Sequence, residues 1–396
     1  MSYRPIGSRL NTYRTAQMML AKLQHGLRAV TFTTLLLVSV VTVPISVMFT
    51  TLPFLLLTIP FFKVPLQFQM HSNVLILWET FVVGLLEHVA GIKIKIFGDS
   101  INTHDNCLYL MNHRTRLDWL YFWVPLLRMK ALTHSRVILR ADLKEIPPTG
   151  WGMQMVNFVF IHRRWETDKE ILRKTLDYFK NMQKPTQLLI FPEGTSLSKD
   201  MKARSDKFAK KNNLPEYNYV LHPRTTGFTY LVQHMKNNNS FDAVYDISIG
   251  YPDKTVEHEL HILKGIFPTE VHYHFKRYAA QDLPSDSEGL ETWCQKRWQE
   301  KEKQLESFYK TKQFDGPLAA CRDSKYLSFL ALLAEILLNG SWIWLMCWSQ
   351  LVFWYTTLCV VLMIIIYIYA RRCHGGLDFM LIDFYNCFYN DRFKTE

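Results

Sequence analysis

Two long uncharged stretches constrain this 396-residue chain more than any other feature. No charged residue occurs between Ala29 and Phe62, and Glu335 is the only charge between Tyr326 and Ala370. Each stretch exceeds the roughly 20 residues with which a helix spans the hydrocarbon core of a bilayer. The sequence therefore predicts membrane-embedded helices near both ends of the chain and argues against a soluble protein.

The first stretch is too long for one straight helix. Pro44, Pro53 and Pro60 are expected to kink it or to divide it into two short helices, so a re-entrant hairpin is an alternative to a span. Its apolar run is longer than that of a cleaved signal peptide and has no small-residue cleavage site, which predicts a retained anchor. The second stretch is expected to break at Asn339-Gly340 and to form a hairpin.

The charge of the chain is basic overall, and most clearly so at the N-terminus. The first 28 residues contain no Asp or Glu and five basic residues, which are Arg4, Arg9, Arg14, Lys22 and Arg28. Because cytosolic segments of membrane proteins are rich in Lys and Arg, this end is expected in the cytosol. The net charge of +11 comes without a basic run or zinc-finger spacing, so anionic lipid and coenzyme A fit better than nucleic acid. A basic membrane protein without an anionic ligand is an equal alternative.

Residues 92–314, between the two stretches, have the strand and helix signals of one α/β domain. Strands are expected at 93–97, 107–111, 156–161, 187–191, 243–249 and 270–275, and helices at 118–129, 167–182 and 288–309. Their alternation favours a mixed or parallel sheet, in which reactive groups gather in loops beyond the carboxyl ends of the strands. The expected order is a basic cytosolic N-terminus (1–28), a membrane anchor region (29–91), the catalytic domain (92–314), a transmembrane hairpin (315–372) and a tail (373–396).

The segment Asn112-His113-Arg114-Thr115-Arg116-Leu117-Asp118 lies where an expected strand ends and an expected helix begins. A loop can bring His113 and Asp118 together, so that the carboxylate holds one imidazole nitrogen and the other nitrogen accepts a proton from a hydroxyl. Alone, this spacing fits a structural histidine at a strand end equally well. A second pair, His374 and Asp378, follows the membrane stretch and is interpreted as coincidence.

Three further segments follow short apolar stretches. Phe191-Pro192-Glu193-Gly194-Thr195 combines a carboxylate with a glycine whose backbone can approach an anion or a glycerol oxygen, although a plain turn is the alternative. Arg163 and Arg164 follow the apolar residues 158–161, and a guanidinium fork suits a phosphate, although a solvated charge pair would look the same. The segment from Leu221 to Phe228 is a proline and glycine turn that contains Pro223 and Arg224.

Together, NHRTRLD, FVFIHR, FPEGT and HPRTTGF resemble, in this order, the four motifs of the glycerolipid acyltransferase family. The resemblance covers about residues 93–309, and the surrounding residues are more similar to the lysocardiolipin branch than to the lysophosphatidate branch. It implies an α/β sheet seated on the membrane, no metal, and acyl-CoA as co-substrate without a further cofactor. It also implies His113 as general base with Asp118 as its partner. The acceptor and donor would be bound by Arg163, Glu193, Gly194, Thr195, Pro223 and Arg224.

One departure from the family pattern concerns the residue after Thr195. Many members have arginine there, whereas this chain has Ser196, and Arg204 is the candidate substitute for the missing phosphate contact. The change favours a phosphodiester acceptor, such as lysocardiolipin or another lysophospholipid, over lysophosphatidate. The alternatives are a lysophosphatidate acyltransferase and a non-catalytic lipid-binding scaffold. A transporter fits poorly, because residues 92–314 contain no span. The resemblance implies a multi-pass protein of the endoplasmic reticulum membrane, with mitochondria-associated membrane as the alternative.

Overall fold

The computed structural model of the chain describes residues 17–20, 23–42, 76–182, 184–257 and 259–393. Pro44, Pro53 and Pro60, on which the expected division of the first apolar stretch depends, lie outside these ranges. So do Arg4, Arg9, Arg14 and Lys22 of the basic N-terminus.

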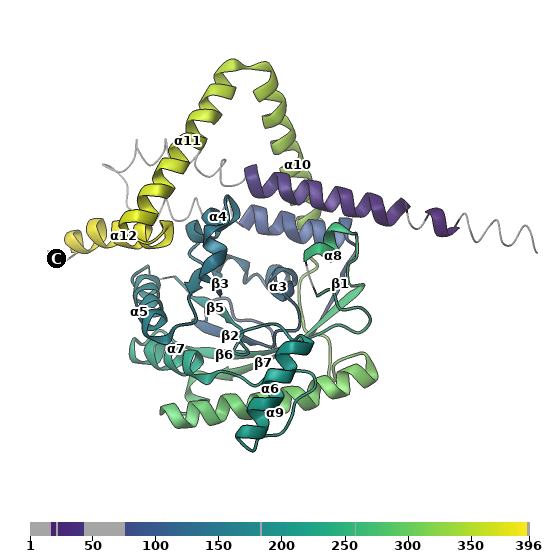
Figure 1. Cartoon of the computed structure of the whole chain (residues 1–396), viewed down its shortest axis with the longest axis vertical. Helices are drawn as coiled ribbons and strands as arrows, with labels where there is room; N and C mark the ends of the chain where they lie inside the picture. The colour runs from purple at the N-terminus through teal and green to yellow at the C-terminus, as the bar shows by residue number, and fades with distance from the viewer. Residues whose placement is uncertain (1–16, 21–22, 43–75, 183, 258, 394–396) are drawn as a thin grey trace, which may run out of the picture.

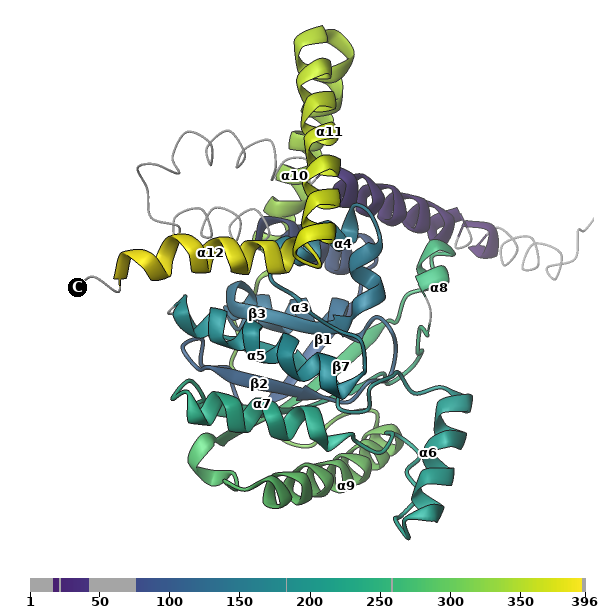
Figure 2. The ribbon, with the colours of Figure 1, turned by 60° about the vertical axis from the view of Figure 1, so that its left-hand side comes forward.

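A seven-stranded mixed sheet forms the centre of the domain (Figures 1 and 2). Its strands are β1 (Lys93–Gly98), β2 (Cys107–Met111), β3 (Ser135–Arg140), β4 (Val159–Ile161), β5 (Gln187–Ile190), β6 (Ala243–Gly250) and β7 (Glu270–Ala279), in the order β1-β7-β6-β2-β5-β3-β4. Among these described strands, only β6 and β7 pair antiparallel. The strands β6, β2, β5, β3 and β4 therefore end at the same edge, and the loops that follow them are neighbours.

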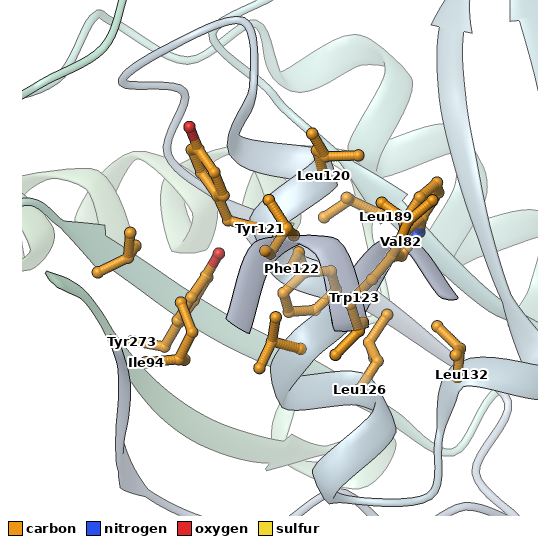
Figure 3. Packing of buried hydrophobic residues seen from close by; sticks show 14 of the residues in the cluster. Val82, Ile94, Leu120, Tyr121, Phe122, Trp123, Leu126, Leu132, Leu189 and Tyr273 are labelled. Atoms are coloured by element: carbon orange, nitrogen blue, oxygen red, sulfur yellow. The ribbon is translucent and has the colours of Figure 1, made fainter. Parts of the chain in front are cut away.

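Helices cover both faces of the sheet, and each face has its own apolar core. They are α3 (Asp118–Arg128), α4 (Thr149–Met155), α5 (Trp165–Asn181), α6 (Lys199–Lys211), α7 (Thr225–Asn237), α8 (Glu259–Leu263) and α9 (Ser287–Thr311), with short turns η1 (Leu85–Val89), η2 (Leu132–His134), η3 (Ala141–Glu145) and η4 (Ala280–Asp282). The core around α3 contains Tyr121, Phe122 and Trp123, which pack with Val82 and Leu189 (Figure 3). The other core joins α5, α7 and α9 to the opposite face. Burying each such large side chain stabilises the fold by about 1.5–3 kcal/mol.

Strands β4 and β3 depart most from the sequence prediction. The expected strand at 156–161 begins only at Val159, because Val156 caps α4 and Asn157 turns the chain with a φ of 60°. Strand β3 was not predicted at all: its charged Arg136 is buried and donates hydrogen bonds to the backbone oxygens of Thr133 and Ser135. A buried arginine interrupts the apolar pattern by which strands are recognised.

The C-terminal apolar stretch forms a helical hairpin of α10 (Lys325–Trp348) and α11 (Gln350–Cys373), followed by α12 (Leu377–Phe393). The predicted break at Asn339-Gly340 is wrong, since α10 continues through both residues. Asn339 Nδ2 donates to the backbone oxygen and to the carboxylate of Glu335 one turn earlier, which keeps the asparagine within the helix. The chain turns instead at Ser349, which is extended, and its hydroxyl accepts a hydrogen bond from Val352 N at the start of α11.

Among the residues that the structure describes, three helices are long and apolar enough to cross a membrane, namely Gln17–Thr42, Lys325–Trp348 and Gln350–Cys373. The hairpin projects from the domain. The helix at 17–42 and α12 lie across the base of the hairpin in both views (Figures 1 and 2). The base of the hairpin is tied to the domain at both legs. Ser328 of α10 donates to Glu87, and Tyr367 of α11 donates to Glu145.

Candidate active site

His113 and Asp118 lie in contact at the carboxyl end of β2. The imidazole Nδ1 is 3.0 Å from Asp118 Oδ2, and the Asp118 side chain is fully buried while that of His113 is 16% exposed. Strand β2 carries the chain to the edge of the sheet, and Asp118 opens α3. Because Nδ1 faces the carboxylate, Nε2 is the nitrogen that is left for an incoming hydroxyl.

Three other hydrogen bonds hold the Asp118 carboxylate. Thr115 donates to it with both its backbone N–H and its hydroxyl, at 2.9 and 3.0 Å. The hydroxyl of Tyr251, which follows β6, donates to Asp118 Oδ1 at 2.6 Å. Tyr251 was not identified from the sequence, where nothing indicates its proximity to a residue 133 positions earlier.

Glu193 links three of the predicted motif segments. Its Oε1 accepts a hydrogen bond from His113 N and its Oε2 accepts one from Leu221 N, both at 3.1 Å. The residue is 4% exposed, and burial raises its pKa to about 8, against the opposing effect of the two backbone hydrogen bonds. Both carboxylate oxygens thus bind the protein's own backbone. This geometry gives Glu193 a part in positioning His113 in addition to the contact with acceptor implied by the family resemblance.

The segment Phe191 to Thr195 packs directly against the histidine. The ring of Phe191 stacks on the imidazole with centroids 4.2 Å apart. Gly194 has a φ of 70°, a conformation that favours glycine, and a Cβ added to it would lie 3.7 Å from the Arg224 side chain. Thr195 follows in the same turn and is half-buried.

Three arginines gather at the same edge of the sheet. Arg140 is the last residue of β3, and its partner in the neighbouring strand β4 is Ile161. Arg163 follows Ile161 by two residues, so Arg140 and Arg163 leave the sheet at the same edge. Arg224 approaches from the fourth segment, where its N–H donates to Pro192 O at 2.8 Å. The pKa of Arg163 is lowered, first by partial burial and then by the positive charges of Arg140 and Arg224. Arg140 was missed because β3 was missed.

The remaining predicted residues lie next to this edge. Pro223 precedes Arg224 in the loop before α7, whereas Gly227 lies within α7, so the expected proline and glycine turn is instead an irregular loop followed by a helix. Arg204 lies on the exposed side of α6 and makes no hydrogen bond or ion pair within the part of the chain that the structure describes. In the described residues, no three His, Cys, Asp or Glu side chains gather in the manner of metal ligands.

The excluded pair, His374 and Asp378, serves a different purpose in the fold. Asp378 contacts Lys144 at 3.3 Å, and His374 Nδ1 contacts Asp383 at 2.6 Å. Neither side chain bonds to the other, and both lie at the base of the hairpin.

Comparison with known proteins gives two family matches. The acyltransferase family model matches residues 93–252, and the acyltransferase C-terminus model matches residues 261–334. The four sequence segments and the site geometry all fall within the first of these matches.

Several curated relatives are similar to the chain. Lysocardiolipin acyltransferase 1 of Mus musculus is 40% identical over 315 residues, which is 78% of this chain and 83% of the relative. The protein of the same name from Danio rerio is 46% identical over 61% of this chain and 62% of the relative, and lysophosphatidylinositol acyltransferase 10 of Caenorhabditis elegans is 41% identical over 60% and 61%. The chain thus spans less than two thirds of the fish and nematode relatives. By these matches and by its site, the chain belongs to the glycerolipid acyltransferase family.

Proposed function

We propose that this chain transfers a fatty acyl group from acyl-CoA to the free hydroxyl of a lysophospholipid, with His113 as general base. The observation that carries the proposal is the contact of 3.0 Å between His113 Nδ1 and Asp118 Oδ2 at the loop edge of the sheet. Relatives named as lysocardiolipin and lysophosphatidylinositol acyltransferases support the choice of acceptor class.

In the proposed mechanism, His113 Nε2 accepts the proton of the acceptor hydroxyl while Nδ1 donates to Asp118. The hydroxyl oxygen attacks the thioester carbonyl, and a tetrahedral oxyanion forms. The carbon–sulfur bond then breaks, the carbonyl re-forms as an ester, and the coenzyme A thiolate takes the proton from the imidazolium. Asp118 stabilises the positive imidazolium between the two proton transfers, and no covalent enzyme intermediate is formed.

The arginines at the sheet edge supply a counter-charge for the acceptor. Arg163 and Arg224 are the residues proposed to bind its phosphate, while the nearby Arg140 is paired with Asp142 at 2.8 Å. The absence of arginine after Thr195 favours a phosphodiester, so lysocardiolipin is the first candidate acceptor. Lysophosphatidate is the second, supported by a 33% identical Arabidopsis thaliana relative named as a probable 1-acyl-sn-glycerol-3-phosphate acyltransferase.

The membrane is the proposed place of reaction, because both substrates carry acyl chains that partition into lipid. The long apolar helices and the lipid-modifying relatives support association with a bilayer. By family analogy we place the chain in the endoplasmic reticulum membrane as a multi-pass protein.

The test uses the purified full-length chain with oleoyl-CoA and a panel of lysocardiolipin, lysophosphatidylinositol and lysophosphatidate. We expect acylation of at least one diester acceptor at a higher kcat/KM than lysophosphatidate. His113→Ala should lower kcat by about 10²–10⁴ without loss of membrane association. His104→Ala, which changes an exposed histidine in the turn before β2, is the matched control. A wild-type protein that binds lysolipid without turnover would instead support the scaffold alternative.

A further inference from the structure

Helix α6 is the most basic element next to the candidate site. It contains six basic and two acidic residues and begins directly after the loop that carries Glu193 and Gly194. The loop is fixed to the active site, because Leu197 N donates to the backbone oxygen of His113 at 2.8 Å. The start of α6 is thus placed next to the candidate base.

One side of α6 is attached to the domain. Ser205 Oγ bonds to His222 Nδ1 at 2.9 Å and accepts a hydrogen bond from His222 N at 3.1 Å, and Ala209 is fully buried. These residues recur at the spacing of one helix face. The attachment joins α6 to the segment that leads to Pro223, so the helix is held in a fixed position relative to the site.

The opposite side of α6 carries Arg204, Lys207, Phe208 and Lys211, which we call the α6 stripe. All four are exposed. Phe208 is 50% exposed, and its ring also contacts the ring of His222, with centroids 5.8 Å apart. Within the described residues, the three cations of the stripe have no ion pair. Like charges four residues apart, as at Lys207 and Lys211, destabilise a helix. A surface of this kind is stabilised when an anion binds to it.

The stripe is unsuited to the bilayer because of its place in the fold. Helix α6 extends from the sheet edge in the direction opposite to the hairpin, towards α9 (Figure 2). The loop on which it packs is held by α9, where Glu302 accepts hydrogen bonds from the backbone of Asn218 and Tyr219. The anion that meets this surface should therefore be water-soluble rather than a headgroup in the membrane plane.

We propose that the α6 stripe binds the nucleotide part of acyl-CoA, with Arg204, Lys207 and Lys211 on its phosphates and Phe208 against its adenine. The inference rests on the function proposed above and extends it to the donor. Proteins commonly bind nucleotides by stacking an aromatic side chain on the base and placing cationic side chains on the phosphates. At about 1.5 Å of rise per residue, Lys211 lies about 20 Å along the axis of α6 from Leu197. The pantetheine arm and diphosphate of coenzyme A extend far enough to connect the thioester at His113 with this surface.

The experiment compares two donors in the full-length enzyme with one acceptor. Oleoyl-CoA carries the nucleotide, and oleoyl-pantetheine has the same thioester without it. Lys207→Ala/Lys211→Ala should raise KM for oleoyl-CoA roughly five- to tenfold, leave kcat unchanged, and leave kcat/KM for oleoyl-pantetheine unchanged. Phe208→Ala should raise KM for oleoyl-CoA in the same selective way. Lys174→Ala/Lys180→Ala, which removes two exposed lysines of α5, should leave KM and kcat/KM unchanged for both donors.

Several results would overturn the inference without affecting the proposed reaction. Equal changes in kcat/KM for both donors would mean that the stripe acts through the structure of the site. The Lys207→Ala/Lys211→Ala enzyme could instead keep its KM for oleoyl-CoA in detergent and bind more weakly to vesicles that contain anionic lipid. That result would show that the stripe binds the membrane. Failure of the proposed function is a separate result, because the wild-type enzyme would then turn over neither donor.

Discussion

At the scale of single residues, four hydrogen bonds converge on Asp118, and they determine which nitrogen of His113 can act as a base. Two of them come from Thr115, one from the imidazole and one from Tyr251. A carboxylate held on both oxygens cannot rotate away from the imidazole, so Nδ1 remains the donor and Nε2 the acceptor. The base therefore depends on a tyrosine that lies outside the four motif segments.

Tyr251→Phe tests this dependence. Loss of a hydrogen bond to a charged group should lower kcat roughly tenfold, with a smaller effect on KM, because the Tyr251 side chain is buried and acts through Asp118. Steady-state kinetics with saturating acceptor measures the change. Tyr121→Phe is the matched control, since Tyr121 is also buried and its hydroxyl has no hydrogen-bond partner among the described residues. Equal losses in both variants would contradict a specific role for Tyr251.

Two buried carboxyl groups should make stability depend on pH. Burial raises the pKa of Glu193 and of Glu79 to about 8, from an ordinary value of 4.5. Between these pH values the unfolded chain has lost protons that the folded chain keeps. The contribution of these two groups to the free energy of unfolding therefore falls as pH rises through this window and levels off above about pH 8.

The test is the thermal midpoint of unfolding across the same window. Glu193→Gln and Glu79→Gln should each reduce the slope against pH, and the double variant should reduce it further. Only Glu193→Gln should also lower kcat, because an amide has one acceptor oxygen and cannot accept from both His113 N and Leu221 N. A slope against pH that is the same in wild type and in both variants would show that these carboxyls are already ionised in the folded protein across this window.

At the scale of elements, the sequence predicted those strands whose apolar pattern is uninterrupted. All five residues of β2 are buried, as expected for an inner strand of a largely parallel sheet, and the histidine follows directly. The motif segments were predicted to meet because such strands end at one edge. Strand β3 and the hairpin turn at Ser349 were not predicted, since Arg136 and Asn339 satisfy their polar groups through local hydrogen bonds that composition does not reveal.

The site was predictable as a set of residues but not as a network. The contact of His113 with Asp118 was expected, because a loop can bring two residues five positions apart together, and the structure has it at 3.0 Å. The two backbone contacts of Glu193 span 80 and 28 positions, so only the fold brings them together. The same holds for Arg140, whose place beside Arg163 depends on the pairing of β3 with β4.

The tail helix α12 is attached to the domain by a buried ion pair. Lys144 and Asp378 are 3.3 Å apart, and their side chains are 9% and 10% exposed. Because removing one partner leaves a buried charge, Lys144→Met alone should cost about 3–5 kcal/mol of unfolding free energy. Lys144→Met combined with Asp378→Leu should recover most of that loss, and chemical denaturation of the single and double variants measures the coupling. Additive losses would mean that the pair contributes nothing.

At the scale of the whole molecule, the hairpin defines how the domain meets the bilayer. If α10 and α11 follow the membrane normal, the helix at 17–42 and α12 lie along the membrane surface (Figures 1 and 2). The first of these helices exposes Leu23, Leu27 and Val30, which suits contact with lipid. Acceptor and donor chains can then remain in the bilayer while their polar parts reach the sheet edge.

The hairpin also predicts the topology of the chain. Its legs are antiparallel, so the domain before α10 and the tail after α11 share one side of the membrane. Arg322 precedes α10, Lys325 begins it, and Arg371 and Arg372 lie in the last turn of α11, which predicts that this side faces the cytosol. The sequon at Asn238 should therefore remain unmodified in cells, whereas a flexible loop with an Asn-Gly-Thr sequon inserted at Ser349 should be glycosylated.

Glycosidase-sensitive mobility shifts distinguish the possible arrangements. The same loop inserted at the exposed Gly316, between α9 and α10, is the matched control and should stay unmodified. Modification at Gly316 or Asn238 but not at Ser349 would place the domain in the lumen and contradict the assignment from charge. Absence of modification at all three positions would mean that the hairpin enters the bilayer without crossing it, since 24-residue helices that cross must expose their turn on the far side.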